Sequence, residues 1–417
     1  MDAASVTLAV LLAIVCLPYM AVGAAFLVGG RSRARFEDAI EPASCLGEGD
    51  IPPVLIQIPC FNEEAFVERA IQALAGLDWP RDKLRVQVLD DSTDDTTRLA
   101  ERAAAAARQS GIDVTVVHRK ARRGYKAGAL HDALGTAAEP FVAILDVDYE
   151  PPRDWLDKAV GALIGNPGLA YVQFRIDFAN RSENWVTRAQ AVLLDGQNVV
   201  EQTGRAICGV LVPFGGTGGV WRREAIEGAG GWQDGTIAED MDLSYRAAEH
   251  GWTGLYLGFW SLKGHLPSSV RAWQTQQLRW ATGGAQVVAS VLRRLRRTAP
   301  KRWSFAVLSS LLLHILEALY APLTVLCLAF VIGRAIAEAF GPADILLAVL
   351  VYLAASLRVF WLPLVAQPVS TGKVGLGSVC RALAGGIYLG LRLAVVKAKG
   401  MVIALSGGGR HFVRTPK

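Results

Sequence analysis

The sequence predicts an α/β domain with a mostly parallel, Rossmann-like sheet, joined to helices that lie in or along a membrane. Between residues 50 and 260, short apolar runs alternate with polar helical patterns, which is the rhythm of βαβ units. Long apolar segments flank this region, and the chain is 52% hydrophobic with a mean hydropathy of +0.30. At 417 residues the chain is too long for one ordinary core, so we expect part of it in lipid.

The chain opens with an apolar segment of transmembrane length, residues 6–30. Arg31, Arg33 and Arg35 follow it, and the positive-inside rule places this flank in the cytoplasm. A cleaved signal peptide is the alternative, because small residues occur near the end of the segment. Since a signal peptide carries its positive charges before its apolar run, we expect a retained helix.

The region after this helix is expected to hold five strands and three helices. The expected strands are residues 54–58, 86–89, 114–117, 142–145 and 171–174. The expected helices are residues 63–77, 95–108 and 125–134, with Asp94 or Asp95 as the N-cap of the second. Ligands of such sheets bind beyond the carboxyl ends of the strands, and two acidic clusters fall at these ends.

A second apolar region follows a basic stretch at residues 293–297, which suits anionic lipid headgroups. Residues 305–332 and 345–365 can each span a bilayer, which takes about 20 residues. Residues 374–405 carry four basic side chains and are expected either to span or to lie partly along the interface. If the domain and the C-terminus are both cytoplasmic, the crossings after the domain are even in number. Two crossings and an interfacial helix satisfy this condition.

The chain is therefore divided into four parts. These are an N-terminal membrane helix (1–35), the α/β domain (50–290), the membrane and interfacial helices (291–405) and a tail (406–417).

Charges and cysteines exclude several classes of protein. The 43 Lys and Arg against 38 Asp and Glu give a net charge of +5 that is spread along the chain. Nucleic acid is therefore not an expected partner, whereas membrane lipids are. The six cysteines lie far apart, without a C-x-x-C pair or a histidine at zinc-ligand spacing, so neither a disulfide framework nor a zinc site is indicated. No pattern indicates an oligomeric state.

Asp146 and Asp148 follow the apolar run 141–145. An Asp-x-Asp at the end of a strand directs two carboxylates toward one hard cation such as Mg²⁺ or Mn²⁺, which in turn can hold a diphosphate. This arrangement predicts a nucleotide-sugar site.

Two further features fit the same site. Asp90 and Asp91 end an expected strand and can accept hydrogen bonds from a base or ribose, with an Asp-rich turn and helix cap as the alternative. Lys126 in G-Y-K-A-G-A-L opens a helix whose backbone amides favour an anion. A solvated charge run accounts for most of the neighbouring basic residues, Arg119, Lys120, Arg122 and Arg123.

Three segments nearer the C-terminus also carry candidate chemistry. Glu239 and Asp240 begin a helix, where a carboxylate can take the proton of an attacking hydroxyl or simply cap the first turn. The glycine-dense loop 215–219 permits close backbone approach to a ligand. Q-Q-L-R-W at 276–280 offers a guanidinium for phosphate and an indole for a sugar ring, with an interfacial Trp/Arg belt as the alternative.

The order D-D-S, G-Y-K-A-G-A-L, D-V-D, F-G-G-T, T-I-A-E-D and Q-Q-L-R-W resembles the processive family 2 glycosyltransferases with a GT-A fold. These are the cellulose synthase and cellulose synthase-like enzymes, and the chain looks most like the mannan/glucomannan synthase-like branch. The resemblance covers about residues 50–290. It implies a metal-dependent, inverting hexosyltransferase that adds a hexose from UDP-glucose or GDP-mannose to a growing β-linked polysaccharide. It also implies a multi-pass protein of the cell membrane with a cytoplasmic catalytic domain. The brevity and alanine-rich composition favour a bacterial inner membrane.

The resemblance further implies individual roles. The implied base is Asp240, with Glu239 beside it, and the implied metal ligands are Asp146 and Asp148. The implied nucleotide-binding residues are Asp90, Asp91, Lys126, Gln276 and Arg279. The implied acceptor contacts are Phe214, Gly215, Gly216, Thr217 and Trp280. Gly215 stands where relatives carry a larger residue such as Cys or Asn, so the resemblance does not define the acceptor fit.

The tail, residues 412–417, is similar to the F-x-V-T-x-K gating loop of cellulose synthases, with Arg414 in place of Val. In that role Thr415 and Lys417 close over the nucleotide and exclude water. A disordered basic tail is the alternative.

Two other functions compete with the synthase. A non-processive transferase that glycosylates a lipid, as in ceramide glucosyltransferase-like proteins, has a similar motif order, and product length separates the two. A nucleotide-sugar sensor or a non-catalytic scaffold is disfavoured, because every acidic position expected for chemistry is present. The motifs do not encode the donor sugar, because the shape of the pocket reads it.

Overall fold

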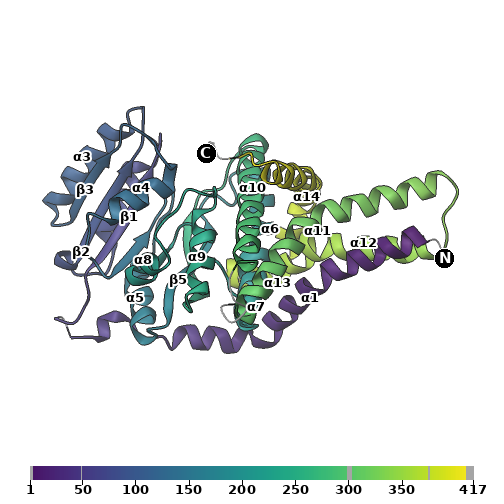
Figure 1. Cartoon of the computed structure of the whole chain (residues 1–417), viewed down its shortest axis with the longest axis horizontal. Coiled ribbons are helices and arrows are strands. Elements are labelled where there is room, and N and C mark those ends of the chain that lie inside the picture. The colour runs from purple at the N-terminus through teal and green to yellow at the C-terminus, as the bar shows by residue number, and fades with distance from the viewer. Residues whose placement is uncertain (1–2, 48, 298–302, 374–375, 410–417) are drawn as a thin grey trace.

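The computed structural model describes residues 3–47, 49–297, 303–373 and 376–409. An α/β domain forms one end of an elongated molecule, and long helices extend from it to the other end (Figure 1). The start of α1 (Ala3–Asp38) lies at the end that is farthest from the sheet, beside the connection between α11 (Phe305–Ile336) and α12 (Pro342–Ser356).

Within the described residues the sheet has seven strands in the order β3-β2-β1-β4-β6-β5-β7. The strands are β1 (Val54–Cys60), β2 (Leu84–Asp90), β3 (Asp113–His118), β4 (Phe141–Ile144), β5 (Leu169–Phe178), β6 (Gly219–Arg222) and β7 (Thr253–Gly264). Only β6 is antiparallel to its neighbours among these strands, so the predicted mostly parallel sheet is confirmed. Sequence reasoning missed β6 and β7 because β6 has four residues and β7 is interrupted by glycines, which weakens the apolar pattern.

The α-helices of the domain are α2 (Val67–Ala73), α3 (Thr96–Gln109), α4 (Tyr125–Leu134), α5 (Trp155–Gly165), α6 (Trp185–Asp195), α7 (Gln202–Ile207), α8 (Arg223–Gly228), α9 (Glu239–Glu249) and α10 (Val270–Leu295). The three expected helices correspond to α2, α3 and α4, and the structure adds six further α-helices up to α10 in the described domain. The predicted helix 63–77 is shorter in the structure, where α2 ends in a 3₁₀ turn, Leu74–Gly76. Asp95 is the N-cap residue of α3, while Asp94 Oδ1 accepts a hydrogen bond from the Thr96 amide at 3.0 Å.

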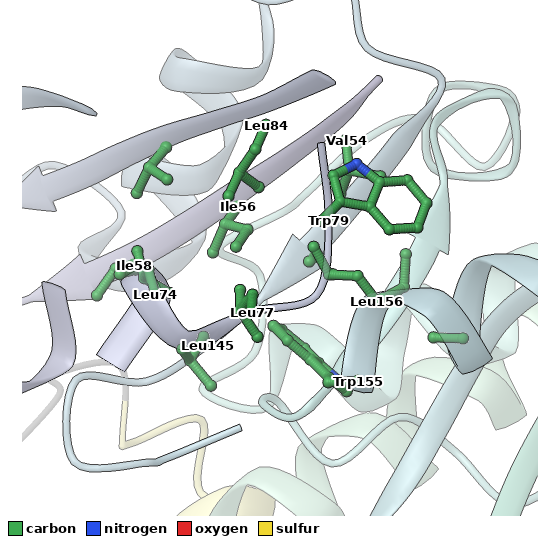
Figure 2. Close-up of a cluster of buried hydrophobic side chains, with 14 of the residues drawn as sticks. Val54, Ile56, Ile58, Leu74, Leu77, Trp79, Leu84, Leu145, Trp155 and Leu156 are labelled. Carbon is green, nitrogen blue, oxygen red and sulfur yellow. The ribbon is translucent and has the colours of Figure 1, made fainter. Parts of the chain in front are cut away.

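The sheet has a hydrophobic core on each face, and Figure 2 shows the core in which strand side chains meet α5 and the loops that cover that face. Ile56 and Ile58 of β1 are fully buried there with Trp155 and Leu156 of α5. Side chains on both faces of β1 are buried, which is typical of a central parallel strand and explains its nearly continuous apolar sequence. The core fixes the strands whose carboxyl ends form the site.

Four helical segments of the described chain are long and apolar enough to cross a membrane. They are α1 (Ala3–Asp38), α11 (Phe305–Ile336), the segment formed by α12 (Pro342–Ser356), a π-helical turn (Leu357–Trp361) and α13 (Leu362–Thr371), and α14 (Leu376–Leu405). Helices α1, α11 and α12 pack side by side. Helix α14 packs on α6, α10 and α11 and is seen strongly foreshortened in Figure 1, so it runs across the direction of the other three.

Buried hydrogen bonds join the first membrane helix to the sheet. Glu37, at the end of α1, accepts hydrogen bonds from the backbone amides of Gly258 and Phe259 in β7, both at 2.9 Å. Arg33, one turn earlier, donates to the same carboxylate at 3.1 Å. Because a buried backbone amide without a partner is costly, these contacts fix the orientation of α1 relative to the domain.

Candidate active site

A cavity of about 740 Å³ lies at the carboxyl ends of β1, β2 and β4 and continues toward α10, α11 and α14. The cavity collects most of the predicted site residues: Asp91, Lys126, Asp146, Asp148, Phe214, Gly215, Gly216, Thr217, Glu239, Asp240, Gln276, Arg279 and Trp280. Thr415 and Lys417 lie outside the described residues.

The two carboxylates after β4 are placed by contacts with the glycine loop and a lysine. Lys126 Nζ lies 2.6 Å from Asp146 Oδ1 and donates to the Gly216 carbonyl at 2.8 Å. The backbone amide of Asp146 donates to Thr217 Oγ1 at 2.8 Å. Burial lowers the pKa of Lys126, but the charges of nearby carboxylates, first Asp146, outweigh burial and raise this pKa above its ordinary value. The ammonium group therefore stays charged.

The donor set suits a hard divalent cation that takes further ligands from its substrate. Asp146 and Asp148 both line the cavity, and the described part of the chain holds no group of three or more metal-ligating side chains. Mg²⁺ is commonly bound by one or two carboxylates together with substrate phosphates and water. Two carboxylates beside a space for a diphosphate therefore fit Mg²⁺ or Mn²⁺.

The glycine loop is held by a residue that sequence reasoning missed. Gln173 of β5 is buried, and its Oε1 accepts from the Gly215 amide at 2.9 Å while its Nε2 donates to the Thr217 carbonyl at 3.0 Å. Gly216 between these residues has φ of +84°, in the left-handed region that favours glycine. A glutamine inside an apolar strand was the available signal, because a buried amide needs partners.

Glu239 and Asp240 lie in the first turn of α9, with the carboxyl group of Asp240 facing the glycine loop. A Cβ atom built on Gly216 would lie 2.6 Å from Asp240 Oδ2. Ser244 Oγ donates to the Asp240 carbonyl at 2.8 Å and accepts from the Phe214 amide at 2.9 Å. Ser244 therefore ties the helix that carries Asp240 to the loop beside it.

Burial makes Glu239 and Asp240 weaker acids than ordinary carboxyl groups. Burial and then the charge of Asp240 raise the pKa of Glu239 to about 7. Burial also raises the pKa of Asp240 above its ordinary value, although the nearby charge of Lys126 opposes this. A carboxylate with a raised pKa is a better proton acceptor near neutral pH than an exposed one.

Asp90 and Asp91 have different surroundings although they are adjacent. Asp91 lines the cavity, whereas Asp90 is fully buried and does not belong to the cavity lining in the described chain. Asp90 accepts from the Ser92 amide at 3.0 Å, from Thr97 Oγ1 at 2.5 Å and lies 2.8 Å from His118 Nδ1. Burial raises the pKa of Asp90, but these hydrogen bonds outweigh burial and lower it overall. The structure gives Asp90 a role in holding the strand ends together.

The expectation of a solvated charge run after β3 is wrong for two arginines. Arg119 binds both carboxylate oxygens of Asp91, through Nε and Nη2, each at 2.8 Å. The guanidinium of Arg122 lies 3.4 Å from the centre of the Phe61 ring and lines the cavity. Because β3 is paired with β2, its end lies beside Asp91, which sequence distance alone does not reveal.

Sequence reasoning also missed the turn that follows β1. Phe61 and Glu63 line the cavity. Asn62 between them has φ of +56°, a conformation that Asn tolerates better than most residues. The backbone amide of Asn62 donates to Ser92 Oγ at 2.8 Å, and its side-chain Oδ1 accepts from the backbone amide of Thr93 at 2.9 Å. The turns after β1 and β2 are therefore joined. The signal was an Asn at the end of an apolar run.

Helix α10 contributes Gln276, Arg279 and Trp280 to the cavity. Burial lowers the pKa of Arg279, although the negative charges of the surrounding carboxylates act in the opposite direction. The indole of Trp280 is about half exposed, at 48%, which leaves a face accessible to a ligand.

The far end of the cavity reaches charged residues among the apolar helices. Lys397 of α14 lies 3.5 Å from Glu317 Oε1 of α11, and Arg358 lies 2.6 Å from Glu201 Oε2. Lys397, Glu317 and Arg358 all line the cavity. Ionisable residues in such helices are expensive and commonly line a polar path or site.

Comparison with known proteins places the chain in a family of glycosyltransferases. The family model described as "Glycosyl transferase family group 2" matches residues 141–366, which is more than half of the chain. The chain therefore belongs to this family, which confirms the resemblance found in the sequence.

Two curated relatives show which members of this glycosyltransferase family the chain is similar to. Glucomannan 4-beta-mannosyltransferase 9 of Arabidopsis thaliana is 38% identical over 307 residues, covering 70% of this chain and 58% of the relative. The probable glucomannan 4-beta-mannosyltransferase 6 of Oryza sativa subsp. japonica is 43% identical over 244 residues, covering 57% of this chain and 42% of the relative. The chain thus spans about half the length of the curated relatives it matches.

A solved structure shares the architecture. It is the mannosyltransferase PcManGT from Pyrobaculum calidifontis in complex with GDP-Man and Mn²⁺, with a TM-score of 0.59 and 23% sequence identity. The match covers 91% of this chain and 99% of that one. At this identity the likeness concerns the fold, and it confirms the predicted GT-A-like domain with its attached helices.

Replacing Gly216 with alanine should inactivate the site. The new Cβ would lie 2.6 Å from Asp240 Oδ2, and the φ of +84° is unfavourable for alanine, so loop and carboxylate must separate. We expect sugar transfer to fall by about 100-fold, the loss that misplacing a reacting group by about 1 Å can cause. Gly235→Ala is the matched control, because a Cβ there meets no atom within 4 Å. Equal activity of the two variants would contradict the assigned geometry.

Proposed function

We propose that the chain is a membrane-bound inverting glycosyltransferase that transfers a hexose, foremost mannose from GDP-mannose, to a growing β-linked polysaccharide. The observation that carries the proposal is the convergence of Asp240, Lys126 and the Asp146–Asp148 pair on one cavity. The names of the relatives as mannosyltransferases, and the GDP-Man bound to PcManGT, put GDP-mannose ahead of UDP-glucose.

In the proposed reaction Asp240 takes the proton of an acceptor hydroxyl. The oxygen attacks the anomeric carbon while the bond from that carbon to the diphosphate oxygen breaks, so an α-linked donor gives a β-linkage and a nucleoside diphosphate leaves. Lys126 and Arg279 place positive charge where the leaving group gains negative charge. A Mg²⁺ or Mn²⁺ ion held by Asp146 and Asp148 would supply further positive charge to the diphosphate.

The cavity provides a separate place for each part of the substrates. The nucleoside fits the end lined by Phe61, Asp91 and Arg122, with Gln276 nearer the diphosphate. The acceptor fits between the loop from Phe214 to Thr217 and the exposed face of Trp280. Closure of Thr415 and Lys417 over the nucleotide stays a prediction from the sequence.

A lipid acceptor is the second candidate. Leu319, Leu393 and Leu405 line the cavity on its membrane side, which would suit an acyl or prenyl chain. Polar groups at the same end, Glu317 and Lys397, suit the hydroxyl groups of further sugars, and these favour the polysaccharide.

We also propose that the catalytic domain is cytoplasmic and that the protein lies in the cell membrane, the inner membrane if the source is bacterial. Arg31, Arg33 and Arg35 follow the apolar part of α1 on the domain side. Helices α11 and α12–α13 then form an outgoing and a returning crossing, and α14 lies along the surface, as its direction across the others supports (Figure 1).

This topology predicts which cysteines react from outside the cell. Ala339→Cys lies in the connection between α11 and α12 and should be labelled by a membrane-impermeant maleimide in intact cells or spheroplasts. The native, exposed Cys45 after α1 should be labelled only after lysis. Each of these two cysteines is labelled in a variant in which the other exposed cysteines have been replaced. If Cys45 were labelled in intact cells and the cysteine at position 339 were not, the orientation would be opposite to the one proposed.

The proposed activity predicts that the purified chain in detergent, supplied with Mn²⁺, incorporates radiolabelled mannose from GDP-mannose into a product that a β-mannanase digests. UDP-glucose is tested in parallel. Asp240→Asn should abolish incorporation and leave the dissociation constant for GDP nearly unchanged, because the amide cannot accept the proton. Label confined to a lipid extract would select the second candidate. Full turnover by Asp240→Asn would disprove the assignment of the base.

The raised pKa values predict a pH dependence of turnover. Glu239 has a pKa of about 7, and burial raises the pKa of the neighbouring Asp240 above its ordinary value. Lowering the pH from above 7 therefore adds protons to this pair of carboxylates and should lower kcat at saturating donor. Turnover should rise with pH and level off above about 7. Glu239→Gln removes a neighbouring negative charge, which favours ionised Asp240, so the rise should move to lower pH. An unshifted pH profile in this variant would show that the two groups do not titrate together.

A further inference from the structure

One side chain outside the cavity lining connects the segment before Asp240 with the end of the last helix. Gln286 of α10 accepts a hydrogen bond from the backbone amide of Ile237 through Oε1 at 3.0 Å. Its Nε2 donates to the carbonyl of Gly408 at 3.0 Å and lies 3.4 Å from that of Gly409. The oxygen and the nitrogen of the Gln286 side-chain amide therefore each form a hydrogen bond with a different segment of the chain.

The first of these segments leads directly into α9. Ile237 and Ala238 line the cavity and precede Glu239 and Asp240. Helix α10 approaches this segment closely, because a Cβ built on Gly283 would lie 2.9 Å from Ala238 Cβ. The Gln286 hydrogen bond adds a directional contact to this packing, so the start of α9 is fixed against α10.

The second segment is the turn 406–409, which follows α14. Helix α14 also packs closely on α10, since a Cβ built on Gly400 would lie 2.7 Å from Ala281 Cβ. Gly407 and Gly409 have φ of +76° and +79°, and these values turn the chain back over α10. A Cβ built on Gly409 would lie 2.6 Å from Thr282 Cγ2, so the turn rests directly on this helix.

We propose that Gln286 is a positioning residue that makes the placement of Asp240 depend on α14. The inference rests on the proposed function, in which Asp240 is the base. Most of the proposed donor contacts lie at the ends of β1, β2 and β4, and Gln276 and Arg279 lie on earlier turns of α10 than Gln286. Loss of the Gln286 contacts should therefore affect turnover and leave nucleotide binding intact. A displacement of a reacting group by about 1 Å can lower the rate by about 100-fold.

Two substitutions separate the two contacts of the amide. Gln286→Leu removes both. Gln286→Glu keeps an acceptor for the Ile237 amide but replaces the donor with a carboxylate that repels the carbonyl oxygens of Gly408 and Gly409. Gln274→Glu is the matched control, because this half-buried glutamine is on the same helix and outside the cavity lining. The full chain in detergent is used for all variants, and thermal melting verifies that each is folded.

We expect kcat to fall by about 100-fold in Gln286→Leu and by at least about 10-fold in Gln286→Glu, with the KM for GDP-mannose and the dissociation constant for GDP unchanged. The control should match the unsubstituted chain. Full turnover by Gln286→Glu would refute the dependence on α14, and an equal loss in Gln274→Glu would refute a specific role for Gln286. A parallel rise in KM would assign the residue to donor binding instead.

Hydrogen–deuterium exchange provides a readout that does not need turnover. In Gln286→Glu the backbone amides of residues 237–241 should exchange faster than in the unsubstituted chain, because the start of α9 loses its link to α14. Unchanged exchange in this segment would overturn the proposal, including for a variant that is too unstable for kinetics. Activity retained by Asp240→Asn would instead overturn the proposed function, while the exchange result would still report on Gln286.

Discussion

The contact between Lys126 and Asp146, at 2.6 Å, is the interaction on which the rest of the site depends. The cavity concentrates carboxylates, since Asp146, Glu239 and Asp240 are all close enough to influence the same ammonium group. Burying several like charges together is costly unless opposite charges and hydrogen bonds compensate. Lys126 provides such a charge, and its second hydrogen bond, to the Gly216 carbonyl, brings the glycine loop to the same point. One side chain thereby orders the end of β4 that carries the proposed metal ligands, the glycine loop and the neighbourhood of the proposed base.

The fold and the acidic clusters could be predicted because they depend on local sequence. The strand before Asp146 is a continuous apolar run, and a carboxylate after such a run falls at a predictable edge of a parallel sheet. Asp90 and Asp91 could not be told apart in this way. Successive side chains of a strand point to opposite faces, so only one of two adjacent carboxylates can face the cavity, and the sequence does not say which.

The supporting residues could not be predicted because their partners are distant in the sequence. Gln173 binds Gly215 and Thr217 of the glycine loop, which follow it by 42 and 44 positions in the sequence. Gln286 binds Gly408, in the turn after α14, which follows it by 122 positions. The basic residues around Arg119 in the sequence suggest a solvated charge run, whereas its partner in the structure is Asp91, directly after the adjacent strand β2. A buried amide or guanidinium signals that partners exist, but only the assembled sheet and helices identify them.

The position of Asp240, the proposed base, explains why the domain and the membrane helices are built as one unit. Asp240 is carried by α9, which Ser244 joins to the glycine loop and which Tyr245 joins to α11 through a contact of 3.0 Å with Ser310 Oγ. The backbone amide of Leu211, just before that loop, also donates to the carbonyl of Ala306 in α11 at 3.1 Å. Reactants must be held to within a fraction of an ångström for efficient transfer. A membrane helix that contacts both α9 and the segment leading into the glycine loop therefore contributes to the rigidity of the site. An α/β domain without α10 and α11 would keep the cavity residues at the strand ends, but it would lose Gln276 and Arg279 of α10 and the contacts that orient the proposed base.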